Sequence, residues 1–328
     1  MTLIGHASAV AALRDAASGD RIHHAWLLAG PKGIGKATFA TAAARWLLAR
    51  EAGPAFESDG LDVPAAHPIG SLLDAGSHPD FRVLARLPKD RSEELARSIA
   101  VDQVRALQPL FATTPSLSRR RVVVIDAIDD LERNAANALL KNLEEPPRGT
   151  IFLLVSHAPG RLLPTIRSRC RLLRFGALDA PEVAAVLRTV LPDADSGEIT
   201  DLVGVAGGAP GTALGFTGLD IAGLDAAIDR LAREGDPGNA LRAQLGRALA
   251  TKAAQGRYEA FLERAPSRIA AAARTAPPAR LGELTALWRQ AREIGDRAVR
   301  QSADPQTTVF ELAGLVAALA HKSAHAKA

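Results

Sequence analysis

The chain has 328 residues, of which 47% are hydrophobic and 4% aromatic, and its 40 lysines and arginines exceed its 36 aspartates and glutamates by four. This length accommodates two or three domains, and a net charge of +4 permits contact with nucleic acid without indicating a polybasic binding protein. The single cysteine excludes a disulfide framework and a four-cysteine zinc site, and no apolar run reaches the roughly 20 residues that span a bilayer, so we expect a cytoplasmic protein without membrane contact.

The first strong pattern along the chain is a strand, a glycine-rich loop and a helix. Residues 25–29 (AWLLA) are apolar, residues 30–38 read GPKGIGKAT, and a helical pattern follows. In this setting backbone N–H groups surround phosphate oxygens and a lysine supplies positive charge. We therefore predict a degenerate P-loop, compatible with ATP or ADP as its ligand, rather than a plain glycine-rich turn. The candidate binding residues are Gly30, Gly33, Gly35, Lys36 and Thr38.

The residue after Lys36 is expected to limit this site. A P-loop needs Ser or Thr directly after its lysine, because that hydroxyl holds Mg²⁺. The position is Ala37, and Thr38 lies one residue further on, about 100° around the helix. Phosphate binding is compatible with these residues, whereas metal binding is compromised.

Residues 51–79 are rich in Gly, Pro, Ala and Asp and predict a long surface loop with one helical turn. His67 and His78, with nearby aspartates, are a candidate metal site. We favour the interpretation that both histidines are scattered surface residues, and we therefore predict no zinc and no other bound metal.

A second apolar run, residues 122–125 (VVVI), ends in Asp126. A carboxylate at this place can hold Mg²⁺ beside a P-loop, directly or through water. The next residue is Ala127, and we predict that Asp129 and Asp130 face elsewhere as the start of a helix. Because a general base must lie within about 3 Å of its water, the catalytic half of this site is expected to be empty.

The most distinctive stretch begins at Asn134, which is suited to cap a helix that ends before Pro146 and Pro147. Residues 151–155 (IFLLV) then predict a buried parallel strand. The strand ends at Ser156, at the sheet edge where open α/β sheets bind ligands, so Ser156 is a further candidate binding residue.

Two phrases of this stretch, NALLKNLEEPP at residues 137–147 and SRC at residues 168–170, resemble the clamp-loader subunits of bacterial DNA polymerase III, which are AAA+ ATPases. The resemblance extends from Leu3 to about Leu214 and implies three domains. These are an α/β P-loop AAA+ domain with a parallel sheet and flanking helices (1–176), a small helical lid domain (177–217) and an all-α C-terminal collar domain (218–328). The zinc module that the family often carries near residues 51–79 has no cysteines here.

The last third of the chain predicts helices, most clearly at residues 280–299. Pro266, Pro277 and Pro305 are expected to mark breaks between helices. The resemblance implies that the apolar helix faces form a core plus a subunit interface, although a monomeric helical domain gives the same pattern.

The resemblance implies that Arg169, beside Ser168, is an arginine finger that reaches a neighbouring subunit's γ-phosphate. A planar, permanently charged guanidinium is suited to stabilise charge in a transition state. One alternative is an ion pair with Glu144 or Glu145. For the surrounding arginines, contact with DNA phosphates is a further alternative.

Three positions depart from hydrolysing members of the family: Ala37, Ala127 where they have Glu, and Pro210-Gly211 where their lid supplies an arginine. The third departure is typical of the delta-prime branch. We therefore predict a mainly non-hydrolysing subunit, without polymerase activity of its own, that works in DNA replication with gamma/tau and delta subunits, the sliding clamp and primed DNA. The alternatives are a gamma/tau-like ATPase and a basic DNA-binding module on an AAA+ scaffold.

Overall fold

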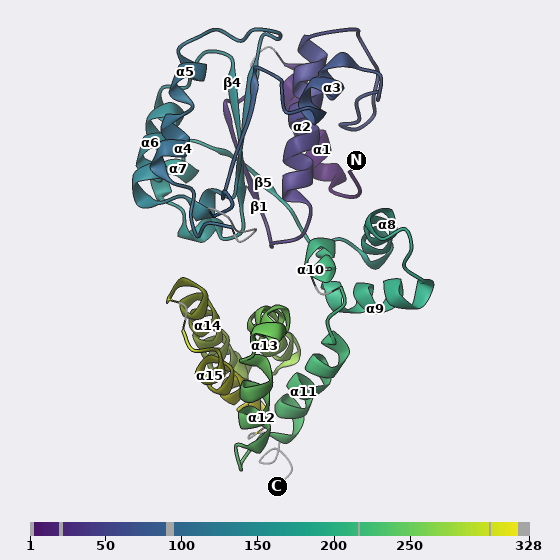
Figure 1. Cartoon of the computed structure of the whole chain (residues 1–328), viewed down its shortest axis with the longest axis vertical. Helices are drawn as coiled ribbons and strands as arrows, with labels where there is room; N and C mark the ends of the chain where they lie inside the picture. Colours follow the sequence, from purple (N-terminus) through teal and green to yellow (C-terminus); the bar gives the residue numbers. More distant parts are fainter. Residues whose placement is uncertain (1–2, 20–21, 90–94, 216, 302, 321–328) are drawn as a thin grey trace. The chain divides into compact units, whose positions relative to one another are not determined.

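The computed structural model describes residues 3–19, 22–89, 95–215, 217–301 and 303–320. The chain divides into two compact units, Met1–Ala213 and Leu214–Ala328 (Figure 1). Within the described residues, no helix combines the length and the apolar character needed to cross a membrane.

The first unit is built on a five-stranded parallel sheet. Its strands lie in the order β2-β3-β4-β1-β5. The strands are β1 (Ala25–Ala29), β2 (Phe81–Ala85), β3 (Arg121–Asp126), β4 (Thr150–Ser156) and β5 (Arg171–Arg174). The three central strands are covered on both faces, which explains their continuous apolar runs. Because the strands are parallel, the residues that follow β1, β3 and β4 meet at one edge of the sheet.

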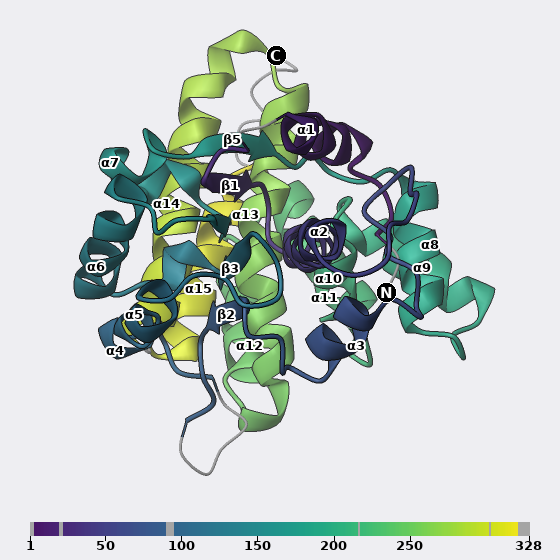
Figure 2. The same ribbon diagram turned by 90° about the horizontal axis from the view of Figure 1, so that it is seen from above.

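Helices cover both faces of this sheet (Figures 1 and 2). One face is covered by α1 (Ala7–Ser18), α2 (Lys36–Glu51) and α3 (Pro68–Asp74). The other face is covered by α4 (Val101–Arg105), α5 (Gln108–Phe111), α6 (Arg133–Glu144) and α7 (Pro164–Arg167). Trp26 and Phe39 are fully buried on the first face, and Leu139 on the second. This arrangement confirms the predicted P-loop α/β fold.

The helix cap predicted at Asn134 is wrong. Helix α6 begins at Arg133 after Glu132, so Asn134 lies in its first turn. The predicted end is confirmed, since the helix stops at Glu144, ahead of the two prolines.

The two histidines of the loop before β2 are buried, which corrects the prediction of surface residues. His67 is 3% exposed and His78 is 1% exposed. The His67 Nδ1 accepts from the amide of Ile69, at 3.3 Å, and its Nε2 donates to Pro54 O, at 3.2 Å. The His78 Nδ1 accepts from the amide of Asp80, at 3.1 Å, and burial lowers the pKa of His78. Both rings therefore stabilise turns, and among the described residues no group of three or more metal-ligating side chains gathers.

The helices α8 (Ala180–Val190) and α9 (Ser196–Ala206) follow the sheet in the first unit, and α10 (Pro210–Leu214) ends at the boundary of the two units. Asp179 and Asp195 cap α8 and α9 by accepting backbone amides at 2.8 Å. Gly207 and Gly208 have φ angles of 56° and 80°, and they turn the chain from α9 into α10. The amide of Leu178 donates to Gly208 O at 2.9 Å, which ties this turn to the residues after β5.

The described residues of the second unit form helices and no strands. They are α11 (Ile221–Glu234), α12 (Ala240–Leu249), α13 (Gln255–Thr275), α14 (Pro278–Gln301) and α15 (Pro305–Ala317). Short 3-10 turns add η1 (Ile128–Asp130), η2 (Pro159–Arg161) and η3 (Lys252–Ala254) to the two units. Helix α14 confirms the helix predicted at residues 280–299, and Leu284 and Ala291 on its inner face are buried.

Pro266 lies inside α13, so the predicted helix break at this proline is wrong. A proline removes one helical hydrogen bond and leaves the carbonyl four residues earlier without its usual donor. That carbonyl belongs to Leu262, and a Cβ placed on Gly295 of α14 would lie 3.7 Å from its oxygen. Pro266 itself is buried, and packing between α13 and α14 therefore offsets the cost of the proline.

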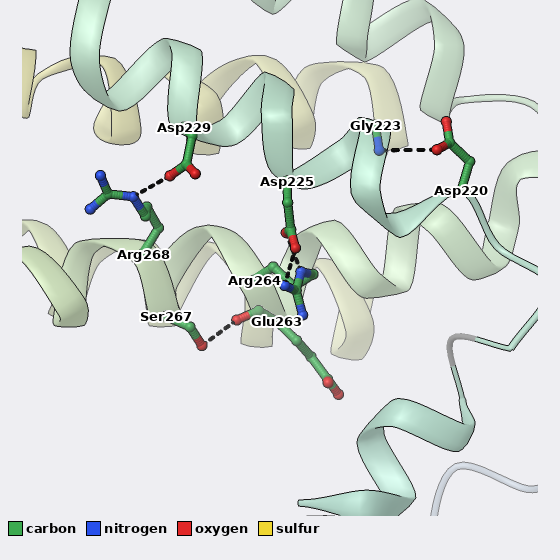
Figure 3. Close-up of polar contacts among 8 residues, drawn as sticks. All are labelled: Asp220, Gly223, Asp225, Asp229, Glu263, Arg264, Ser267 and Arg268. Atoms are coloured by element: carbon green, nitrogen blue, oxygen red, sulfur yellow. Dashed lines mark hydrogen bonds and ion pairs between the residues drawn. The ribbon is translucent and has the colours of Figure 1, made fainter. Parts of the chain in front are cut away.

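Ion pairs join α11 to α13 along one side of both helices (Figure 3). Arg264 donates to both carboxylate oxygens of Asp225, and the Arg268 Nε donates to Asp229 Oδ1 at 2.6 Å. The pairs are spaced four residues apart on each helix, so they fix one register between the two helices.

Candidate functional site

The P-loop lies between β1 and α2, as the sequence predicts. Gly30 follows β1 directly, and α2 begins at Lys36. Gly33 and Gly35 have φ angles of 77° and 98°, which glycine adopts without a Cβ clash. Thr38 lies half-buried in the first turn of α2. The five candidate residues of the loop therefore gather at the carboxyl edge of the sheet.

Lys36 is bound by its own loop. Its Nζ donates to Gly30 O at 2.7 Å and also to Pro31 O, and the residue is only 3% exposed. Burial lowers the pKa of Lys36 to about 8, against the opposing effect of Asp129 and Asp126. The ammonium group that a P-loop directs at phosphates is therefore occupied by backbone carbonyls.

Helix α10 packs directly on the loop. The amide of Gly211 donates to Gly33 O at 2.8 Å. A Cβ on Gly33 would lie 2.6 Å from the amide nitrogen of Thr212, and a Cβ on Gly211 would lie 2.9 Å from the Gly33 Cα. Two glycines therefore allow the contact, at the place where the resemblance implies an arginine in hydrolysing relatives.

These contacts fit a bound nucleotide poorly. Phosphate oxygens would compete with two carbonyls for Lys36 and with α10 for the space beside Gly33. Ala37 offers a metal ion no hydroxyl.

Replacing Gly211 with alanine tests the packing of α10 on the loop. We expect Gly211→Ala to lower the free energy of unfolding of the first unit by about 1–3 kcal/mol, because the new methyl group overpacks the contact with Gly33. Urea unfolding monitored by circular dichroism measures this change. Gly204→Ala, on α9 with open space around it, is the matched control and should leave stability equal or higher. Equal stability of the two variants would show that the contact is loose.

Asp129 lies at the site, which corrects the prediction that it faces elsewhere. The η1 turn directs its carboxylate toward the end of β4. There it accepts from the Ser156 Oγ at 3.0 Å and from the amides of His157 and Ala158 at 2.6 Å and 3.2 Å. Ser156 is fully buried, so its hydroxyl is committed to Asp129.

Asp126 ends β3 beside the P-loop, as predicted. Burial raises its pKa, with a further contribution from Asp130. Asp130 itself pairs with Arg86 at 3.1 Å, and Ala127 is buried without a polar side chain. The carboxylates that follow Asp126 thus already have partners, and the position where the resemblance implies a water-activating glutamate carries a methyl group.

Arg169 follows the short helix α7. Its Nη2 contacts Glu144 Oε1 at 2.8 Å, its Nη1 donates to Thr165 O at 2.9 Å, and its side chain is 34% exposed. The Ser168 hydroxyl donates to the same carbonyl at 3.1 Å. The ion pair predicted as an alternative is therefore present, and the guanidinium remains accessible from solvent.

Exposed arginines surround this position. They are Arg161, Arg167, Arg171 and Arg174. The guanidinium of Arg171 lies over the ring of Trp26, 4.9 Å from its centroid, which gives that side chain a packing role.

A parallel sheet in the order β2-β3-β4-β1-β5, with a P-loop after β1 and an aspartate at the end of β3, is the architecture of AAA+ P-loop proteins. The family model for DNA polymerase III, delta subunit, matches residues 5–179. The chain belongs to this family.

Individual relatives agree with this assignment. DNA polymerase III subunit delta' of Pseudomonas aeruginosa is 42% identical over 193 residues, which are 58% of this chain and 54% of that protein. The delta' subunit of Bacillus subtilis is 35% identical over 164 residues, which are 48% of this chain and 44% of that protein. Subunit tau of Escherichia coli is 31% identical over 189 residues, which are 58% of this chain and 27% of that protein. The match thus spans about half the length of the delta' relatives.

Among solved structures, a DNA polymerase III gamma subunit-related protein from Thermotoga maritima is similar, with a TM-score of 0.46 and 15% identity. The alignment covers 95% of this chain and 99% of that protein.

Proposed function

We propose that this chain is a delta-prime-like subunit of the DNA polymerase III clamp loader. In this proposal it hydrolyses little or no ATP and supplies Arg169 to the ATPase site of a neighbouring gamma or tau subunit. Its partners are gamma/tau and delta subunits and the sliding clamp, with primed DNA contacted through the assembled ring. Its three domains are residues 1–176, 177–217 and 218–328, of which the last contributes to a collar between subunits.

The main support for the proposal is that three functional groups needed for ATP hydrolysis are missing around the P-loop. Ala37 lacks the metal-binding hydroxyl, Ala127 lacks the water-activating carboxylate, and Gly211 lacks the lid guanidinium. Each of these groups acts on the chain's own nucleotide, whereas Arg169 is suited to act on a neighbour's. The chain therefore keeps the group that serves another subunit and lacks those that would serve itself.

Family membership and the delta' relatives support the role in the clamp loader. The contacts of Lys36 support the absence of turnover, because a lysine held by two carbonyls must first leave them to reach a phosphate.

ATP hydrolysis by the isolated chain tests whether it is a motor. We expect no phosphate release above background, and no change in Lys36→Ala, because no residue is in place to activate water. The matched control is the gamma or tau subunit assayed alone under the same conditions. Phosphate release that disappears in Lys36→Ala would instead establish a gamma/tau-like ATPase, which is the second candidate function.

Two observations favour the gamma/tau-like ATPase. The loop keeps its glycines and Lys36, and subunit tau of Escherichia coli is 31% identical over 58% of the chain. It is the weaker candidate, because Ala37 and Ala127 provide neither the metal-binding hydroxyl nor the water-activating carboxylate.

A further inference from the structure

Helix α6 ends at an acidic residue, Glu144, whose negative charge is unfavourable at a helix C-terminus. The C-terminus of a helix carries partial negative charge and favours basic side chains. Helix α6 ends at Glu144 and is followed at once by Glu145. Two carboxylates at this end do not stabilise the helix, so Glu144 is not explained by an interaction with its own helix.

The contacts of Glu144 supply an explanation. Helices α6 and α7 lie side by side on the same face of the sheet (Figure 2). Glu144 Oε1 contacts the Arg169 Nη2 at 2.8 Å, while the Arg169 Nη1 donates to Thr165 O at 2.9 Å. The two acceptors come from different helices. Together they fix both the position and the plane of the guanidinium.

The base of Arg169 is already rigid. Ile166 is 1% exposed and anchors α7 in the core, and Cys170 packs against the same cluster. Burial raises the pKa of Cys170 to about 12, so its thiol is neutral and acts as an apolar packing group. Packing fixes the backbone at Arg169 but not its long side chain, which the two acceptors hold instead.

We propose that Glu144 is a positioning residue that orients the Arg169 guanidinium for its action at a neighbouring subunit. This inference rests on the proposed function of Arg169. Both side chains are partly exposed, at 34% for Arg169 and 48% for Glu144, so the ion pair is solvent-screened. Glu144 and Thr165 each accept from one nitrogen of the guanidinium, so its remaining N–H groups can meet a phosphate while Glu144 keeps the finger oriented.

A double-mutant cycle in the reconstituted loader, with clamp and primed DNA present, tests this inference. Turnover of ATP is measured for wild type, Glu144→Ala, Arg169→Ala and the double variant. We expect Glu144→Ala to lower kcat by about threefold to fivefold, the factor that an exposed ion pair can contribute, with the KM for ATP unchanged. We expect no further loss when Glu144→Ala is added to Arg169→Ala, because the effect passes through the guanidinium.

Two further variants separate positioning from other roles. Glu144→Gln keeps an acceptor oxygen and should restore most of the turnover that Glu144→Ala loses. Glu145→Ala removes the adjacent exposed carboxylate and should leave turnover at the wild-type value. The melting temperature of Glu144→Ala should equal or exceed that of wild type, because a negative charge leaves a helix C-terminus.

Four outcomes would overturn the inference. An equal loss of kcat from Glu144→Ala with and without Arg169 would indicate a structural role. A rise in kcat would mean that Glu144 holds the finger back. A strong loss in Arg169→Ala with no effect of Glu144→Ala would refute the positioning role alone, whereas no loss in Arg169→Ala would refute the proposed function as well.

Discussion

Arg169→Ala is expected to cause the largest loss of activity of any single change in this chain. Arginine fingers contribute roughly 10³- to 10⁵-fold to the rate at the site that they serve. We expect steady-state turnover of the whole loader to fall less, because in the proposed role Arg169 serves one ATPase site and other subunits serve the rest. The measurement is phosphate release by a loader reconstituted from gamma or tau, delta and this chain, with clamp and primed DNA.

Two variants control this experiment. Arg167→Ala removes an exposed arginine two residues away and should keep wild-type turnover. Arg169→Lys keeps the charge but loses the planar fork, so it should rescue little of the loss. Gel filtration must show the same assembled complex for every variant. Equal turnover of the Arg167→Ala and Arg169→Ala loaders would refute a finger at this position.

The second large effect concerns the pH dependence of folding stability. The pKa of Lys36 falls from 10.5 to about 8 on folding, so the unfolded chain binds this proton more tightly. Below about pH 8 the folded state bears the full cost of the buried charge, and this cost disappears as pH rises toward 10.5. Relative to Lys36→Met, which carries no charge here, wild type should gain about 3 kcal/mol of stability over this interval.

Urea unfolding at pH 7 and at pH 10.5 measures this gain as a difference between the two proteins. Comparing variants cancels the titration of groups elsewhere in the chain. Lys32→Met removes an exposed lysine of the same loop and is the control for loss of charge alone. A stability difference between wild type and Lys36→Met that does not change with pH would mean that the ammonium is not buried as described.

Local patterns predicted the central strands and the P-loop well. The apolar runs at residues 122–125 and 151–155 fall within β3 and β4, and the glycine-rich loop joins β1 to α2. These patterns are reliable because a strand covered on both faces requires a continuous apolar run, and a loop with positive φ angles requires glycine.

The sequence does not predict the polar contacts among the residues of the candidate site. Asp129 reaches Ser156 across 27 residues of chain, and Gly211 reaches Gly33 from α10. Lys36 was predicted as a phosphate ligand from its register, but its bonds to Gly30 and Pro31 depend on the curvature of the folded loop. Polar side chains that meet only through tertiary packing leave no periodic signal.

His67, His78 and Pro266 lie in surroundings that differ from those predicted for them. The composition of residues 51–79 predicts a surface loop around His67 and His78, but both rings are buried and each accepts a backbone amide of a nearby turn. Pro266 was assigned to a helix break by its missing N–H, but α13 continues because its buried side packs against α14. At Pro266 a tertiary contact outweighs the local preference of the residue, whereas the two histidines accept from amides of their own turns.

The most direct measurement counts the ATP molecules cleaved in the first turnover of the reconstituted loader, by rapid quench with clamp and primed DNA present. If Arg169 serves one neighbouring site, the fast phase of the wild-type loader should exceed that of the Arg169→Ala loader by one ATP per complex. The remaining sites should keep their rate. Equal amplitudes and equal rates for the two loaders would contradict a finger that acts at a neighbouring subunit.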